Sequence, residues 1–210
     1  MTIEKIIHLI WIGDESKMPK DCIYSWIIKN PEFKVKLWGN EDLEKRNWFF
    51  KEQIQCWISK EINGAADIMR WEILYKYGGI ALDADSFCLN PLEDWLLQTD
   101  LFSVWENELE RPGLIATGAM GAIKKHWFIK EIIKYIVEDK NLLGDLAWKK
   151  LGPLRLTTTY KKAGKNCMTI YPSHFFYPNH FTGNRYSGSG ILFAKQAWGS
   201  TRNSYSKLSF

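Results

Sequence analysis

The sequence predicts an α/β fold in which a mainly parallel, twisted sheet is flanked by helices. Residues 5–12 form an apolar, β-branched run that ends at Gly13, and residues 19–29 follow as a helix that stops before the turn at Asn30-Pro31. Residues 33–38 alternate apolar and polar side chains, as a half-buried strand does. A strand, a helix and a second strand in this order are typical of the opening of an α/β sheet.

Later segments continue the alternation of helices and strands. Residues 40–60 are polar and charged and predict further helix. Residues 64–77 carry helix formers and stop at Gly78-Gly79, where a left-handed cap costs little, and residues 80–82 then enter a short buried strand. The remaining predicted elements are strands at 101–105, 114–122 and 168–171, and helices at 127–138 and around 154–163.

The length of the chain predicts one domain. With 210 residues, 46% of them hydrophobic, it can bury one substantial core. The tail, residues 183–210, is rich in Gly, Ser and Asn and predicts loops with a mobile lid. The first residues show no basic leader before an apolar run, and no stretch stays apolar long enough to span a bilayer, so we expect a soluble cytoplasmic domain without a transmembrane segment.

Composition narrows the classes of partner. The four cysteines show no CxxC pair or repeated spacing, which argues against a zinc site and a disulfide framework. A formal net charge of +4 without a long basic run is too small to indicate nucleic acid as a partner, and an anionic small substrate fits it equally well. The 11 tryptophans fit a large aromatic core, and aromatic faces also stack on sugars and bases.

Residues 65–85 carry the chemistry that the sequence offers. Asp67 and Arg70 stand three apart on the predicted helix, so their side chains share a face and can meet each other or a common ligand. For this pair, a structural ion pair and a ligand-binding role are both open. Asp83 and Asp85 follow two residues apart at the end of the predicted strand, which places both carboxylates on the same side if the extended geometry persists.

Two neighbouring carboxylates repel each other unless a positive charge lies between them. A hard divalent cation, Mg²⁺ or Mn²⁺, supplies that charge, because such ions take a few carboxylates and complete their shell with water and phosphate oxygens. Asp85 is the first choice for a direct ligand. Asp83 has two open roles: contact with the metal through water, or hydrogen bonds to the ribose or sugar hydroxyls of a ligand.

The order of helix, Gly-Gly stop, apolar strand and D-x-D resembles the DXD-containing sugar transferases of glycosyltransferase family 32, of GT-A type. That family includes capsular polysaccharide, mannosyl and glucosyl transferases, with the glucosylating domains of clostridial toxins as distant relatives. The resemblance covers most of the chain: the opening strand 6–13, the C-x-x-S-W and N-P stretch of 22–31, D-x-x-R as Asp67/Arg70, Y-G-G at 77–79, the D-x-D, and the strand at 169–172. Bacteria and large DNA viruses encode small transferases of this kind, some as one domain of a longer protein.

The resemblance implies a function and a set of residues. It implies metal-dependent transfer of a hexose from a nucleotide-sugar, with UDP favoured, to a hydroxyl of a carbohydrate acceptor, with retention of configuration. The donor-binding half is about 1–95 and the acceptor or lid half about 96–210, within a single domain 1–210. Donor contacts are expected from Ile10, Trp11, Ile12, Ala84, Trp198 and from the catalytic set Asp67, Arg70, Asp83 and Asp85.

The C-terminal loop departs from the family pattern. The family has a His and a Ser-Trp pair there, which provide a third metal contact and a donor contact, whereas residues 194–201 contain no His. Three replacements are open: Gln196 gives the metal an oxygen, Lys195 neutralises phosphate, or Trp198 covers the donor. For Trp11, packing near the base and a role in the core are equally open.

Other polar residues give weaker signals. Thr117-Gly118 follows a predicted strand where family members often have a sugar- or acceptor-facing turn. Glu106 and Asp145 are candidate acceptor-side acids, with a solvated surface charge as the more common role of each. His8 is expected in the core, and His174 and His180 lack a third partner for a metal.

Two other classes of function compete with a transferase. A Mg²⁺-dependent phosphohydrolase also uses a D-x-D, but it needs the first Asp after the first strand, with a downstream Lys and further acids. A catalytically silent nucleotide-sugar or carbohydrate-binding module is harder to exclude, because of the altered C-terminal loop. No oligomer is indicated by the sequence.

Overall fold

The computed structural model describes residues 2–164, 166–202 and 205. Its central sheet has the strand order β2-β1-β3-β6-β5-β7, in which β1 is parallel to β2 and β3, β6 runs antiparallel to both neighbours, and β5 is parallel to β7. The predicted mainly parallel α/β fold is confirmed. The strands of this sheet are β1 Ile6–Ile10, β2 Lys34–Trp38, β3 Gly79–Asp83, β5 Leu101–Val104, β6 Ala119–Ala122 and β7 Thr169–Tyr171.

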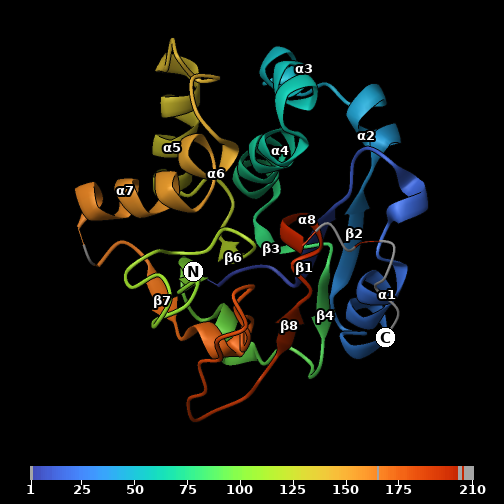
Figure 1. Cartoon of the computed structure of the whole chain (residues 1–210), viewed down its shortest axis with the longest axis vertical. Coiled ribbons are helices and arrows are strands. Elements are labelled where there is room, and N and C mark those ends of the chain that lie inside the picture. The colour runs from blue at the N-terminus through green and yellow to red at the C-terminus, as the bar shows by residue number, and fades with distance from the viewer. Residues whose placement is uncertain (1, 165, 203–204, 206–210) are drawn as a thin grey trace.

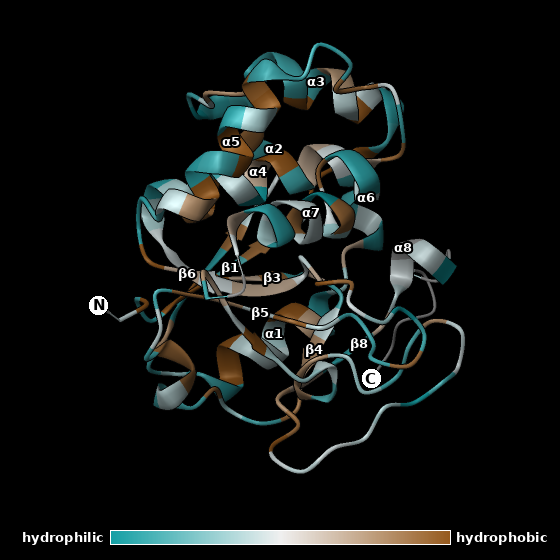
Figure 2. Ribbon diagram, turned by 90° about the vertical axis from the view of Figure 1, so that its left-hand side faces the viewer, coloured by the Kyte–Doolittle hydropathy of each residue, from teal (hydrophilic) through white to brown (hydrophobic). Residues whose placement is uncertain are grey.

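Helices cover both faces of the sheet. In Figure 1 and Figure 2, α3 to α7 gather on one face, while α1 lies on the other beside a small sheet of β4 and β8. The helices are α1 Lys20–Lys29, α2 Asn40–Lys45, α3 Lys51–Lys60, α4 Ile62–Tyr77, α5 Trp127–Glu138, α6 Ala147–Lys150, α7 Pro153–Ala163 and α8 Gly199–Arg202. The remaining elements are β4 Ser86–Cys88, β8 Ala194–Gln196, and the 3-10 turns η1 Glu15–Lys17, η2 Asp94–Leu97 and η3 Ser173–Phe175.

Alternation along the strands divides the apolar residues between two cores. Ile7 and Leu9 of β1 belong to the core under α1, whereas Ile10 belongs to the core under α3 to α7. On β3, Leu82 and Ala81 point to opposite cores in the same way. Successive side chains of a strand point to opposite faces, so the period of two places the helices on both sides.

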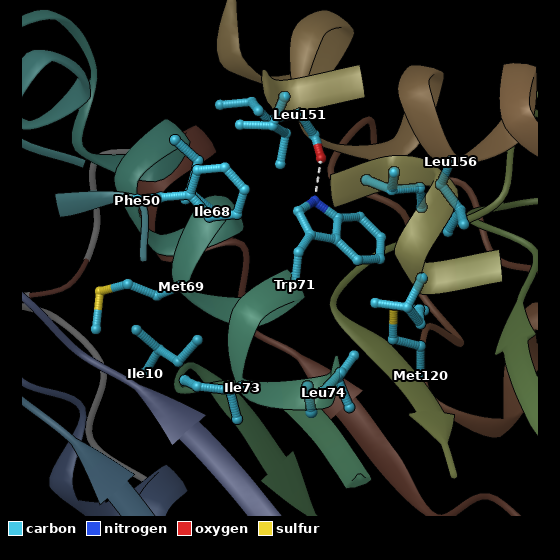
Figure 3. Packing of buried hydrophobic residues seen from close by; sticks show 14 of the residues in the cluster. Ile10, Phe50, Ile68, Met69, Trp71, Ile73, Leu74, Met120, Leu151 and Leu156 are labelled. Atoms are coloured by element: carbon cyan, nitrogen blue, oxygen red, sulfur yellow. Dashed lines mark hydrogen bonds between the residues drawn. The ribbon is translucent and has the colours of Figure 1, made fainter. Parts of the chain in front are cut away.

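Several tryptophans are structural. Trp71 of α4 is fully buried among apolar side chains, and its indole nitrogen donates a hydrogen bond of 2.8 Å to the carbonyl of Leu151 (Figure 3). On the other face, Trp26 donates 2.7 Å to the carbonyl of Ser86. A buried indole combines a large apolar surface with one donor that needs a partner. These two residues therefore fix α4 and α1 against the neighbouring segments.

A sharp turn joins α4 to β3. The helix ends at Gly78, with φ of +67°, and Gly79 has φ of +87°. Glycine adopts these left-handed conformations without a steric cost, and a Cβ at Gly79 would lie 2.6 Å from the carbonyl oxygen of Ile6. The turn therefore feeds β3 directly into the centre of the sheet, beside β1.

Two sequence predictions about secondary structure are wrong. Only Ala119–Ala122 of the predicted strand 114–122 is a strand. The preceding residues are held instead by an isolated bridge from Ile115 to Trp105 and by the Thr157 hydroxyl, which accepts from the Ile115 amide at 2.9 Å. The tail also contains β8 and α8 rather than loops alone, because β8 pairs with β4, which the sequence did not reveal. Residues 203–204 and 206–210 of the predicted lid lie outside the described residues.

The four cysteines are free thiols, as expected. Within residues 2–164, 166–202 and 205, no helix combines the length and the apolar character that crossing a membrane requires.

Candidate functional site

The D-x-D lies where β3 turns into β4. Asp83 is the last residue of β3, and Ala84 and Asp85 form the turn. The condition set for 83–85, that extended geometry persists, is not met, because the chain reverses toward β4 directly after Asp83. The two carboxylates nevertheless converge: the Gln196 side-chain nitrogen donates to Asp83 Oδ2 at 3.2 Å and to Asp85 Oδ1 at 2.7 Å.

Gln196 reaches this place through the pairing of β8 with β4. Ser86 and Gln196 face each other in the antiparallel register, and the Ala197 amide donates to the Asp85 carbonyl at 3.0 Å. The Gly199 amide then donates to Asp85 Oδ2 at 2.7 Å. The C-terminal segment therefore closes over the D-x-D, and before the structure only the family resemblance indicated this contact.

Arg70 lies directly behind the D-x-D. Its side chain is buried, and its guanidinium donates to Asp83 Oδ1 at 2.6 Å and pairs with Asp67 Oδ1. The prediction that Asp67 and Arg70 share a face of one helix and meet is confirmed. A guanidinium that is shared between two carboxylates fixes the orientation of both, so Arg70 positions Asp83.

The site has an excess of negative charge. Three carboxylates, those of Asp67, Asp83 and Asp85, lie here, and the guanidinium of Arg70 pairs with the first two. Burial raises the pKa of Asp85 to about 6, the charge of Asp83 adds to the rise, and hydrogen bonds from Gly199 and Gln196 oppose it. Burial likewise raises the pKa of Asp67 to about 6, against the attraction of Arg70. A cation at this point would therefore relieve electrostatic repulsion.

The donor atoms fit a hard divalent cation. Gln196 Oε1 is buried and has no hydrogen-bond partner, while its Nε2 contacts both carboxylates. Since the two ends of an amide exchange by a flip, the same side chain can present oxygen at that position. Two carboxylates and one amide oxygen, completed by water and phosphate, suit Mg²⁺ or Mn²⁺. In the part of the chain that the structure describes, no cluster of three His, Cys, Asp or Glu forms an alternative site.

A pocket of about 330 Å³ opens in front of the two aspartates. Lys195, the alternative contact for phosphate, is not among the lining residues; its ammonium lies over the Phe87 ring instead. The wall brings together the other residues predicted to contact a donor or a metal: Ile10, Trp11, Ile12, Asp67, Arg70, Asp83, Ala84, Asp85, Gln196 and Trp198. It adds lining residues that the sequence did not single out as donor contacts: Ile62, Asn63, Ala66, Thr117, Thr201 and Tyr205. These residues are distant in the sequence, and only the sheet order brings them together.

Aromatic side chains form the walls of this pocket. Trp11 meets Tyr205 edge to face, with 4.8 Å between ring centroids, and also packs against the core under α1. Both roles considered for Trp11 are therefore compatible with its position. Trp198 is held by a hydrogen bond of 2.9 Å to the Asn179 carbonyl and has φ of +58°, an uncommon conformation outside glycine. Flat aromatic walls beside a cation site, where a bound cation would hold phosphate, suit a nucleotide.

Gly118 and Tyr177 are site residues whose importance the sequence did not show. A Cβ at Gly118 would lie 1.9 Å from Asp83 Oδ2 and 2.5 Å from the Tyr177 hydroxyl, so these three residues meet. Burial, together with the charge of Asp83, raises the pKa of Tyr177 well above its usual value. For Gly118 the sequence offered one signal, the predicted turn at Thr117-Gly118. For Tyr177 it offered none, because this residue lies in a run of aromatic residues that is typical of a core.

The two candidate acids lie in different surroundings. Glu106 is buried, with Arg111 at 3.3 Å and His180 at 3.5 Å, so its interpretation as a solvated charge is wrong. Burial raises its pKa, with Arg111 opposing and Asp83 contributing. Asp145 is more exposed and pairs with Lys149. Neither acid is among the residues that line the pocket.

The three histidines considered in the sequence, His8, His174 and His180, are buried. His8 is 2% exposed, as expected for a core histidine. His174 contacts the Ser189 carbonyl at 2.9 Å, and His180 contacts the Thr182 hydroxyl at 2.9 Å. One ring nitrogen of each has a polar partner, while His174 Nδ1 and His180 Nε2 have no hydrogen-bond partner within the part of the chain that the structure describes. Among the described residues these histidines form no metal-binding group.

The fold, with the D-x-D at the carboxyl end of β3, is that of glycosyltransferase domains of GT-A type. The family of the glycosyltransferase sugar-binding region containing a DXD motif matches residues 16–102. The prediction of a DXD-containing glycosyltransferase family is thus confirmed. The match covers α1 to β4 and includes Asp67, Arg70, Asp83 and Asp85.

Curated relatives agree with this assignment. Inositol phosphoceramide mannosyltransferase 3 of Schizosaccharomyces pombe is 30% identical over 140 residues, which are 63% of this chain and 36% of the relative. An uncharacterised glycosyltransferase of Acanthamoeba polyphaga mimivirus is 33% identical over 100 residues, 45% of this chain and 40% of the relative. The chain therefore matches about two fifths of the length of these relatives.

Solved structures share the fold. The PaToxG glycosyltransferase has a TM-score of 0.63 at 18% identity and covers 77% of this chain and 70% of its own. The UDP-bound glycosyltransferase domain from the YGT toxin has a TM-score of 0.55 at 10% identity, with 81% and 80% covered. At these identities the likeness establishes the fold alone.

Proposed function

We propose that this protein transfers a hexose from a nucleotide-sugar, with UDP as the favoured nucleotide, to a hydroxyl of a carbohydrate acceptor, and that Mn²⁺ or Mg²⁺ supports the reaction. The observation that carries the proposal is the convergence of Asp83 Oδ2 and Asp85 Oδ1 on one nitrogen of Gln196, at the mouth of an aromatic-walled pocket.

The chemistry of the leaving group explains the need for this arrangement. When the bond between a sugar and a nucleoside diphosphate breaks, negative charge accumulates on phosphate oxygens. A divalent cation, held by Asp83, Asp85 and the Gln196 oxygen, supplies positive charge at that point when it is bound. Arg70 holds Asp83 in place through the bond of 2.6 Å, so the carboxylate does not need to reorganise during the reaction.

The donor is oriented by the remaining lining residues. In this proposal, Trp11 and Tyr205 contact the base, Ile10 and Ile12 line the nucleotide end, and Asp67 accepts hydrogen bonds from the sugar. A UDP-bound toxin domain of the same fold supports the choice of UDP. The name of the Schizosaccharomyces pombe relative supports a hexose such as mannose as the transferred group.

Retention of configuration is part of the same proposal. The acids that line the pocket are Asp67, Asp83 and Asp85, and all three accept hydrogen bonds from neighbouring side chains. An inverting enzyme needs a further carboxylate that is free to act as a base toward the acceptor. Among the described residues of the pocket wall no acid is free to act as that base or as a covalent nucleophile, so the proposal of retention rests on the family resemblance.

Calorimetric titration with a panel of nucleotide-sugars tests the proposal. We expect one UDP- or GDP-sugar to bind in the presence of Mn²⁺ and to lose binding in EDTA or in Asp85→Ala. Asp145→Ala, a change of the same type at a partly exposed acid that does not line the pocket, is the matched control. Binding that ignores both the metal and Asp85 would contradict the proposed mechanism.

Turnover separates this function from its two competitors. A transferase hydrolyses its nucleotide-sugar slowly in the presence of metal when no acceptor is added, whereas a silent binding module releases no sugar. A phosphohydrolase would instead act on simple phosphomonoesters. Release of a hexose from one nucleotide-sugar, without action on phosphomonoesters, is the expected result.

A further inference from the structure

A second concave surface lies at the other end of α4. It is a groove of about 720 Å³, and its wall is mostly apolar. The groove is lined by Asn47, Trp48, Phe49, Phe50, Glu72, Tyr75, Lys76, Lys124, Lys125 and Ile133. These residues come from the segment before α3, the end of α4, the loop after β6, and α5. The nucleotide-sugar site uses none of them.

The charges around this groove are mainly positive. Lys76, Lys124 and Lys125 are exposed, and none of the three forms a salt bridge to the described residues. The one acid of the lining, Glu72, is buried, and its two oxygens accept the Phe49 and Phe50 amides at 2.9 and 3.3 Å. Both carboxylate oxygens of Glu72 are thus engaged by backbone amides inside the protein. The rim therefore complements an anionic group placed above an apolar floor.

Two features distinguish this rim from an ordinary surface. Phe49 is 73% exposed, although Trp48 and Phe50 on either side of it are buried. Lys125 has φ of +58°, and its amide donates to the Tyr75 carbonyl at 2.8 Å, which holds the backbone that carries Lys124 and Lys125 beside the groove. A non-glycine residue in this conformation is uncommon and points to a constraint at this position. Exposed aromatic rings and clustered lysines are both used by proteins that bind anionic membrane surfaces.

The groove and the nucleotide-sugar pocket are physically separate. Asp67 of the pocket and Tyr75 of the groove are eight residues apart on α4, which is about 12 Å along the helix axis. Gly79 at the start of β3 pairs with Ala122 just before the lysines, whereas Asp83 at its other end forms the pocket. An occupant of the groove therefore leaves the pocket open.

We propose that this groove docks the protein on a membrane surface rich in anionic lipids. The lysines bind the headgroup phosphates or carboxylates, Phe49 enters the interface, and the apolar floor of Trp48, Phe50 and Ile133 receives part of an acyl chain. The binding is peripheral, since one aromatic side chain and a few lysines give reversible attachment. The inference concerns where the protein acts, and it stands without the proposed transferase function.

Flotation with lipid vesicles tests the proposal. The full chain is mixed with vesicles of phosphatidylcholine alone or with phosphatidylserine added at one part in four, at low and at high salt. We expect flotation with the anionic vesicles only and its loss at high salt, because screening weakens contacts between lysines and headgroups. Lys124→Glu with Lys125→Glu should weaken binding by about 30-fold or more, and Phe49→Ser should weaken it as well.

A matched control uses the adjacent exposed lysines of α7. Lys161→Glu with Lys162→Glu makes the same change of charge away from the groove and should leave flotation unaltered. Thermal unfolding followed by circular dichroism shows that each variant is folded, without reference to any nucleotide-sugar. Equal flotation with neutral vesicles, equal loss in the control pair, or no effect of Phe49→Ser would overturn the proposal. So would binding of monomeric dodecyl phosphate without binding of vesicles.

Discussion

Two buried polar clusters lie beside β3 and differ in how completely they are satisfied. At the start of β3, His8 of the neighbouring strand β1 makes a hydrogen bond of 2.9 Å with the carbonyl of Gly78. The indole nitrogen of Trp38 donates to the other ring nitrogen of His8 at 3.1 Å. After the strand ends, Asp83 and Asp85 share one donor of Gln196, and the Gln196 oxygen has no partner. The first cluster is complete, because the His8 ring is neutral and both of its nitrogens have hydrogen-bond partners. The second cluster is charged and incomplete, because the Gln196 oxygen has no hydrogen-bond partner among the described residues.

The difference shows how a structural polar group differs from a functional one. Burial lowers the pKa of His8 to about 4, so the ring stays neutral and its two hydrogen bonds need no ion. Buried polar atoms without a partner cost free energy, and proteins retain few of them. The second cluster keeps such atoms together with an excess of carboxylates, which is the arrangement that a cation and a diphosphate would complete.

The largest expected effect is that of Asp85→Asn. The amide keeps the shape of the side chain but removes a negative ligand, so metal-supported turnover should fall on the order of 10³-fold. Without metal, the unfolding temperature should stay equal or rise, because a buried carboxylate is replaced by a neutral group. Nucleotide-sugar hydrolysis and thermal melts measure the two effects. Unchanged turnover would show that the incomplete cluster is not the metal site.

Gly118→Ala should disturb the same cluster through packing. The added methyl would lie 1.9 Å from Asp83 Oδ2, so Asp83 or the strand must move, at a cost of about 1–3 kcal/mol in unfolding free energy. Nucleotide-sugar affinity should fall together with stability. Gly39→Ala is the control, since its methyl has only an ordinary contact of 3.8 Å with the Trp11 carbonyl. Equal stability of the two variants would contradict the close approach at Gly118.

The complete cluster gives a dependence of stability on pH. The pKa of His8 is about 4 in the folded chain and 6.5 as the unperturbed value, so the unfolded chain binds more protons between these values. Stability from His8 is therefore present above pH 6.5 and is lost as the pH falls, by about 2 kcal/mol at pH 5. His8→Gln should lose less stability than the wild type over the same range, as measured by urea unfolding at pH 7.5 and pH 5.

The smallest expected effect is that of Gln196→Glu. A third carboxylate beside Asp83 and Asp85 should lower the unfolding temperature without metal, because like charges repel. It should also raise the affinity for Mn²⁺, by about tenfold, since a charged oxygen replaces a neutral one. Gln196→Met, which offers no oxygen, should bind Mn²⁺ more weakly than the wild type. An affinity for Mn²⁺ that is the same in all three proteins would exclude Gln196 from the metal shell.

Much of the fold was predictable because it depends on local patterns. The helix predicted at 127–138 is α5, and the Gly78-Gly79 stop marks the end of α4. These features follow from periodicity and from the conformational freedom of glycine, which act within a few residues. The strand at 114–118 was predicted wrongly, because the Thr157 hydroxyl and an isolated bridge hold that segment instead of a ladder.

The sequence by itself determined the α/β alternation, the pair of aspartates after a buried strand, and the shared helical face of Asp67 and Arg70. Only the tertiary structure decided that Gln196 meets both aspartates, that Gly118 and Tyr177 press against Asp83, and that Tyr205 faces Trp11. The physical reason is sequence separation. Pairing of β8 with β4 joins residues more than 100 positions apart, and no local pattern specifies which strands become neighbours.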